Sequence, residues 1–239
     1  MSTFVLVHGA FRGGWSWRRV RPRLIAAGHD VYAPTLDGDA SGLETWVDQV
    51  VGLLETEDLL DVVLVGHSQG GVVVREVAVR VPGRLRRLVY LDAAVPDPGE
   101  RAVDVAPTAP DDALLPPRDT LIPPRPLAAG GDLDESTAAW LNDRLVPTPF
   151  GPSLDPVSAG EPAVPASYAF FADTPPAYPS GTTRARLDAR GTPYDVVDGG
   201  HDGPLTRPEA VADLLLRSAA PRLVVGAPIH PATPTRGTP

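Results

Sequence analysis

One stretch of the chain, Val62-Val63-Leu64-Val65-Gly66-His67-Ser68-Gln69-Gly70-Gly71, places an apolar run directly before a glycine-rich turn. The run 62–65 is short and mostly β-branched, which is typical of a buried strand. Residues 71–81 have a helical pattern that Pro82 and Gly83 end. The turn between strand and helix reads G-x-S-x-G around Ser68. Glycines two residues before and after a serine leave room for a sharp turn that exposes its hydroxyl, so Ser68 is a candidate nucleophile.

Short apolar runs alternate with helical patterns on both sides of this stretch. This alternation predicts an α/β fold, in which helices cover both faces of a mostly parallel, doubly wound sheet. Ser41 with Glu44, and Thr206 with Glu209, have the spacing of a capping box and predict the starts of two helices. The expected strands are 4–7, 31–34, 62–65, 87–91, 168–171 and 194–197, and the expected helices are 15–27, 41–58, 71–81, 183–189 and 207–218.

The amino-acid composition and the hydrophobic pattern change between residues 96 and 165. Fifteen prolines fall there, and only 136–145 has a clear helical period. We therefore expect a core domain made of 1–95 and 161–225, interrupted by an inserted cap at 96–160. The tail 226–239 is rich in Pro, Thr and Gly, and we expect it to be disordered.

Composition excludes several classes of protein. The chain has 239 residues, of which 43% are hydrophobic, enough for a sizeable core. Its net charge of −9 argues against binding to nucleic acid or to an anionic membrane. It has no cysteine, and no apolar run reaches the length of a membrane span. No secretory signal is visible at the N-terminus, so the expected location is cytoplasmic.

Four blocks resemble the α/β-hydrolase superfamily. Residues 4–11 (FVLVHGAF) are similar to its first strand and oxyanion loop, and 13–17 (GGWSW) to the start of its first helix. The block 66–71 (GHSQGG) resembles its nucleophile elbow, and 199–205 (GGHDGPL) its histidine loop. The resemblance covers about residues 3–218. It is nearest to the small-capped branch that contains plant methylesterases, hydroxynitrile lyases and bacterial esterases.

The resemblance implies a catalytic triad in the chain order serine, acid, histidine. Ser68 is then the nucleophile and His201 the base, because the other four histidines lie too early or in the tail. Asp173 follows the expected strand 168–171 and is the expected acid. Asp92, at the end of strand 87–91, is the second candidate for the acid. Two aspartates that flank the last strand, Asp195 and Asp198, are further candidates.

The same resemblance implies the rest of the site. The backbone N–H groups of Ala10 and Gln69 would form the oxyanion hole, and Phe11, Trp140 and Phe150 are candidate substrate-binding residues. Neither a cofactor nor a metal ion is expected, since no cluster of ligating residues has metal-site spacing.

Three functions fit these residues. The first is hydrolysis of an ester, thioester or lactone of a small, apolar or aromatic molecule. The second is a cofactor-independent lyase or cyclase that uses Ser68 and His201 for proton transfer, and the third is a ligand-binding protein with little turnover. Gly9, where hydroxynitrile lyases have a threonine, and Asp202, where they have a lysine, weigh against a cyanohydrin lyase. The sequence leaves the natural substrate and the oligomeric state open.

Overall fold

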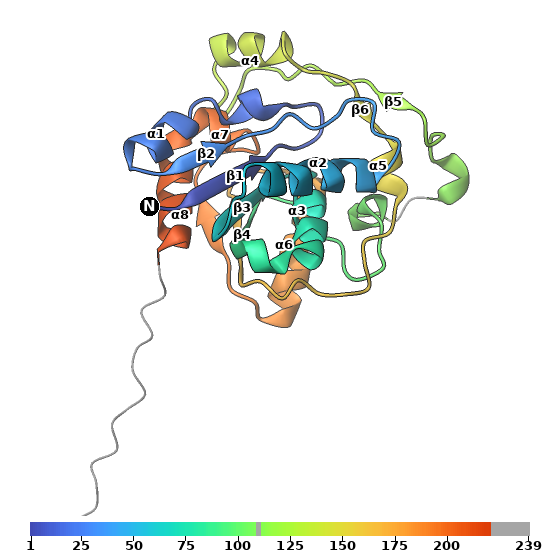
Figure 1. The fold of residues 1–239 in the computed structure, drawn as a ribbon. Helices are drawn as coiled ribbons and strands as arrows, with labels where there is room; N and C mark the ends of the chain where they lie inside the picture. The colour runs from blue at the N-terminus through green and yellow to red at the C-terminus, as the bar shows by residue number, and fades with distance from the viewer. Residues whose placement is uncertain (109–110, 221–239) are drawn as a thin grey trace, which may run out of the picture.

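The computed structural model describes residues 1–108 and 111–220, so the predicted disordered tail lies outside the described residues. Its centre is a sheet of six strands in the order β2-β1-β3-β4-β7-β8, and every pairing is parallel (Figure 1). The predicted α/β fold is therefore confirmed. The strands are β1 (Thr3–Val7), β2 (Asp30–Tyr32), β3 (Val62–His67), β4 (Leu85–Leu91), β7 (Ala166–Phe171) and β8 (Asp195–Val197).

Alternate residues of each strand enter two separate cores, one on each face of the sheet. Val5 and Val7 of β1 face the core that packs against α2 (Leu43–Thr56) and α3 (Gly70–Arg80). Phe4 and Leu6 face the opposite core, under α1 (Arg21–Ala26) and α8 (Pro208–Ala219). This two-residue alternation is why the central strands read as continuous apolar runs.

The starts of two helices differ from the sequence prediction. The side chains of Ser41 and Thr206 cap neither α2 nor α8. Instead, the N–H of Leu43 donates to Oδ2 of Asp155 at 2.8 Å, so a residue far along the chain caps α2. The predicted helix 15–27 is divided into a 3₁₀ turn (Gly14–Trp17) and α1. Within the described residues, no helix combines the length and the apolar character needed to cross a bilayer.

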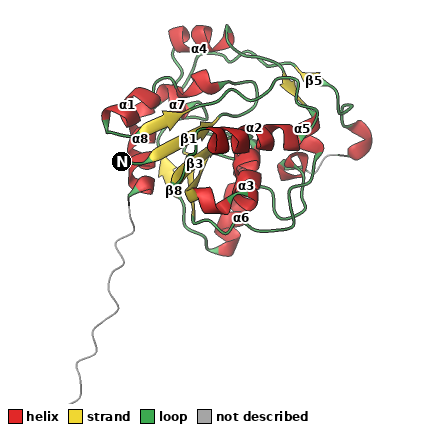
Figure 2. Cartoon of the chain, in the orientation of Figure 1, coloured by secondary structure: helices red, strands yellow, loops and turns green. Residues whose placement is uncertain are grey.

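The segment 96–160 is inserted between β4 and β7, two strands that pair side by side. It contains a small antiparallel sheet and two helices, which arch over one side of the main sheet (Figure 2). The helix predicted at 136–145 begins one residue earlier, because the carboxylate of Asp134 accepts from the N–H of Thr137. The strands and α-helices described in this segment are β5 (Leu121–Ile122), α4 (Glu135–Asn142), β6 (Thr148–Pro149) and α5 (Gly151–Leu154), and two 3₁₀ turns, Ala102–Val105 and Asp112–Leu114, precede them.

After β7 the chain returns to the sheet. The helix α6 (Pro179–Arg190) joins β7 to β8, and the short helix α7 (Gly203–Thr206) precedes α8. Parallel strands carry their carboxyl ends to the same edge of the sheet, so the residues that follow β3, β4, β7 and β8 meet there.

Candidate active site

Ser68 lies on the turn between β3 and α3, as the sequence predicts. Its φ is +54°, a conformation that is strained for a residue with a side chain. The flanking glycines allow this turn to pack closely. A Cβ on Gly66 would lie 2.6 Å from the carbonyl oxygen of Gly70, and a Cβ on Gly70 would lie 2.6 Å from that of His8. Side chains at either position would therefore displace Ser68.

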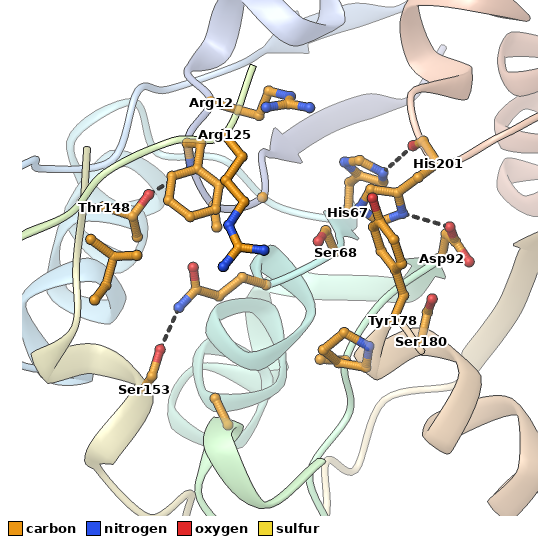
Figure 3. Close-up of a pocket in the computed structure, with 18 of the residues that line it drawn as sticks. Arg12, His67, Ser68, Asp92, Arg125, Thr148, Ser153, Tyr178, Ser180 and His201 are labelled. Atoms are coloured by element: carbon orange, nitrogen blue, oxygen red, sulfur yellow. Dashed lines mark hydrogen bonds and ion pairs between the residues drawn. The ribbon is translucent and has the colours of Figure 1, made fainter. Parts of the chain in front are cut away.

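His201 follows β8 and is hydrogen-bonded to a carboxylate. Its Nδ1 lies 2.6 Å from Oδ2 of Asp92, and since an ionised carboxylate only accepts, Nδ1 carries the proton. The same oxygen accepts a hydrogen bond of 2.6 Å from Oγ1 of Thr174. In Figure 3 the side chains of Ser68, His201 and Asp92 follow one another in that order. Ser68 and His201 thus line the same cavity, together with the second candidate for the acid.

Asp173, the expected partner of His201, does not contact the histidine. Its side chain is exposed, and its backbone N–H donates to the carbonyl of Gly199 at 3.0 Å. Thr174, the next residue, points toward Asp92 instead. Asp195 and Asp198 are also exposed. The prediction of Asp173 as the histidine's partner is wrong because the chain after β7 turns its next side chain, and not Asp173, toward the sheet edge.

Asp92 remains ionised although it is 1% exposed. Burial alone would raise the pKa of this carboxyl, but the hydrogen bonds from His201 and Thr174 together hold it below the usual value. Asp92 also has a positive φ of +46°, and its N–H donates to the carbonyl of Ala169 on the neighbouring strand β7. The carboxylate is therefore held rigidly in an orientation suited to stabilising a positive charge on His201.

Two buried histidines support the structure of the site and do not act as proton carriers. Nε2 of His67 lies 2.9 Å from the carbonyl oxygen of His201, which requires a proton on that nitrogen. Burial lowers the pKa of His67 to about 3, and that of His8 to about 4. His8 is fixed between the carbonyl of Gly9 and the N–H of Leu36. Both rings are neutral near pH 7 and hold the two loops around Ser68.

Two backbone N–H groups beside Ser68 are free to bind an oxyanion. Neither the N–H of Ala10 nor that of Gln69 donates to another group among the described residues. The N–H of the next residue, Phe11, is occupied by Oγ1 of Thr148 at 2.6 Å. Phe11 has a φ of +63°, so this contact from the inserted segment holds a strained loop in place.

A cavity of about 600 Å³ opens above Ser68, with His201 and Asp92 in its wall. Phe11 and Phe150 line it as expected. Trp140 does not: its ring packs against the guanidinium groups of Arg18 and Arg144, so the prediction of a pocket tryptophan is wrong. Ten lining residues belong to the inserted segment, namely Ala102, Val103, Ile122, Pro123, Arg125, Leu127, Thr148, Pro149, Phe150 and Ser153.

Several side chains around this cavity were not predicted from the sequence. Thr174 bonds Asp92, and Tyr178 lies with its ring centre 4.7 Å from that of His201. Nε2 of Gln69 donates to Oγ of Ser153 at 2.8 Å, which ties the serine turn to the inserted segment. The only sequence feature that could have indicated Thr174 is its position shortly after a strand, and Asp173 has the same feature. Among the described residues, no three side chains of the His, Cys, Asp or Glu type gather as a metal site.

A parallel sheet with a strained serine turn, and a histidine–aspartate pair at the same edge, defines the α/β-hydrolase class of fold. The sequence pattern of the alpha/beta hydrolase family matches residues 4–214, and the chain belongs to that family.

Three relatives show which proteins of the family are similar in sequence to this chain. The chain is 46% identical over 118 residues to a carbendazim hydrolyzing esterase of Nocardioides sp. (strain SG-4G), a match of 46% of this chain and 49% of the relative. It is 42% identical over 106 residues to salicylic acid-binding protein 2 of Nicotiana tabacum, and 39% over 106 residues to an alpha-hydroxynitrile lyase of Arabidopsis thaliana. Each of these two matches covers 39% of this chain and 40% of the relative. The chain thus spans half or less of the length of these relatives.

Solved structures share the fold over nearly the whole chain. An extracellular alpha/beta-hydrolase from a Paenibacillus species superposes with a TM-score of 0.71 at 24% identity, covering 91% of this chain and 99% of that one. A pyrethroid hydrolase from Sphingobium faniae JZ-2 superposes with a TM-score of 0.68 at 23% identity, covering 91% and 97%. At these identities the likeness supports the fold alone.

Proposed function

We propose that this protein is a carboxylesterase-like serine hydrolase that cleaves an ester, thioester or lactone of a small molecule. The observation that carries the proposal is the 2.6 Å hydrogen bond between His201 and Asp92 in the wall of the cavity that also contains Ser68. The names of the relatives, which include several methylesterases and a carbendazim hydrolyzing esterase, support the same reaction class.

The chemistry follows from the roles of these three side chains. Ser68 Oγ attacks the ester carbonyl carbon while Nε2 of His201 takes the hydroxyl proton. Asp92 keeps the proton of the imidazole on Nδ1 and stabilises the imidazolium. His201 then gives its proton to the departing alcohol, and an acyl-enzyme remains. A water molecule, deprotonated by His201, attacks the acyl carbon, and the acid product leaves as Ser68 regains its proton.

The negative charge of each tetrahedral intermediate develops on the former carbonyl oxygen. In this proposal the free N–H groups of Ala10 and Gln69 bind it, and such a donor contributes about 3 kcal/mol to the transition state in serine hydrolases. We assign residues 96–160 the role of a cap, because they supply much of the cavity wall and hold the oxyanion loop through Thr148.

The lyase alternative is less well supported by the geometry. A Cβ on Gly9 would lie 2.6 Å from Cβ of Ser68, so this position has no space for a hydroxyl-bearing side chain. Asp202, the residue after His201, is paired with Arg12 at 2.8 Å and presents a negative charge. Neither residue supplies the threonine hydroxyl or the lysine that the resemblance associates with cyanohydrin cleavage.

A labelling experiment with turnover tests the proposal. The wild type and the Ser68→Ala variant are incubated with a fluorophosphonate, and intact mass and peptide mapping are compared with hydrolysis of 4-nitrophenyl acetate and butyrate. We expect one adduct on Ser68, turnover in the wild type and neither in the variant. Labelling without turnover would favour a lyase, cyclase or binding protein, and no labelling would contradict an activated serine.

A further inference from the structure

The charged side chains that line the cavity are not all paired. Arg12 bonds Asp202, and both side chains are largely buried. Asp92 bonds His201. Arg125, which also lines the cavity, forms no ion pair or hydrogen bond with any residue in the described part of the chain. The chain has 30 acidic residues against 21 arginines, so a lack of carboxylates does not explain this.

Arg125 is held at the cavity by its surroundings in the inserted segment. It follows β5 in the sequence Ile122-Pro123-Pro124-Arg125-Pro126. Proline rings fix the backbone angle φ at three of these five positions, so few other paths are open to this stretch. Figure 3 shows the guanidinium of Arg125 pointing from the cap into the cavity that contains Ser68 and Ser153.

Arg125 is exposed, and most of the wall that it shares with Ser68 is apolar. The same cavity is lined by Phe11, Ile122, Leu127 and Phe150, whose apolar surfaces would exclude water from a bound ligand. Ser153 offers a second donor, because its Oγ accepts from Gln69 and its own hydroxyl proton remains free. A guanidinium binds a carboxylate through two parallel hydrogen bonds, and the carboxylate in the described wall, that of Asp92, is bonded to His201.

We propose that Arg125 is a specificity-determining residue that binds a carboxylate carried by the substrate of the Ser68 site. The preferred substrates are then esters with a free carboxylate at a distance from the scissile bond. This inference rests on the proposed hydrolase function. The carboxylate can lie on the acyl side or on the alcohol side of the ester, and the test treats the two sides separately.

Matched pairs of esters measure the preference. On the acyl side, 4-nitrophenyl hydrogen adipate is compared with methyl 4-nitrophenyl adipate, and on the alcohol side 4-acetoxybenzoate is compared with its methyl ester. We expect the charged member of at least one pair to have a kcat/KM about tenfold higher in the wild type, mostly through KM. In Arg125→Gln this ratio falls to about 1, and in Arg125→Lys part of it returns.

The control is Arg144→Gln, which removes the same charge from the cap outside the cavity, where the guanidinium lies on Trp140. This variant should keep the wild-type ratio. Equal kcat/KM for both members of each pair in the wild type, or a preference that persists in Arg125→Gln, would overturn the inference.

A binding measurement separates this inference from the proposed function. Calorimetry measures the affinities for 4-acetoxybenzoate and for its methyl ester in two full-length proteins. These are the Ser68→Ala variant and the double variant that also carries Arg125→Gln. Tighter binding of the carboxylate that the second substitution abolishes supports the inference even if no ester is hydrolysed. Equal binding of both compounds contradicts it, whatever the labelling of Ser68 shows.

Discussion

Asp92 and Thr174, at the carboxyl ends of the paired strands β4 and β7, are joined by a hydrogen bond of 2.6 Å from Oγ1 to Oδ2. The oxygen that receives this bond is the one that faces Nδ1 of His201. Two strand ends therefore cooperate at one carboxylate: β4 supplies the charge, and β7 supplies a neutral donor that fixes its direction.

Replacing Asp92 with Asn should lower kcat about 10⁴-fold, because the amide cannot hold the imidazole in the tautomer that accepts the serine proton. Steady-state hydrolysis of 4-nitrophenyl butyrate measures the change. Asp173→Asn is the matched control, since Asp173 is exposed and away from His201, and it should stay within about twofold of wild type. A large loss in Asp173→Asn with normal turnover in Asp92→Asn would reverse the assignment.

Thr174→Val removes the donor to Asp92 while keeping the shape of the side chain. We expect kcat to fall about tenfold with little change in KM, because a hydrogen bond to a charged group is lost at a position that does not face the substrate. Thr174→Ser restores the hydroxyl and should recover most of the rate. If the serine variant were as slow as the valine variant, the effect would come from packing and not from the hydrogen bond.

Gly9→Ala should abolish turnover and slow fluorophosphonate labelling by at least about 100-fold. A Cβ at this position would lie 2.6 Å from Cβ and 3.1 Å from Oγ of Ser68, so the serine turn or the oxyanion loop must move. Gly52→Ala is the control, because its new methyl group meets nothing within 4 Å on α2. That variant should label normally and unfold at slightly higher urea, since alanine favours helix.

The two buried histidines predict how stability depends on pH. Their pKa values lie near 3 for His67 and near 4 for His8, whereas an unfolded histidine titrates near 6.5. The unfolded state therefore binds more protons below about pH 6.5, and the free energy of unfolding should fall as the pH is lowered. Two such groups contribute a loss of about 2 kcal/mol between pH 6 and pH 5, measurable by urea unfolding.

His67→Gln keeps a donor toward the carbonyl of His201 but removes one titrating group. Its free energy of unfolding should therefore depend about half as steeply on pH in the same window. An identical dependence in the variant and the wild type would show that His67 takes up its proton in the folded state.

The sequence by itself determined the local features of this protein. The strand 62–65, the glycine turn and the following helix follow from the spacing of apolar residues and glycines within a few positions, and they place Ser68 correctly. The parallel α/β sheet follows from the alternation of apolar runs and helical patterns. His201 was identified through a resemblance in the order of the motifs, and that order is also a property of the linear sequence.

Only the tertiary structure decided which residues from distant strands meet. The sequence offered Asp92 and Asp173 at equivalent positions after two strands, and the direction of each side chain depends on how β4, β7 and β8 lie in the sheet. The same reason explains why Asp155 caps α2, and why Trp140 packs against two arginines and does not line the cavity. Local spacing fixes secondary structure, but contacts between segments far apart in the chain require the packed fold.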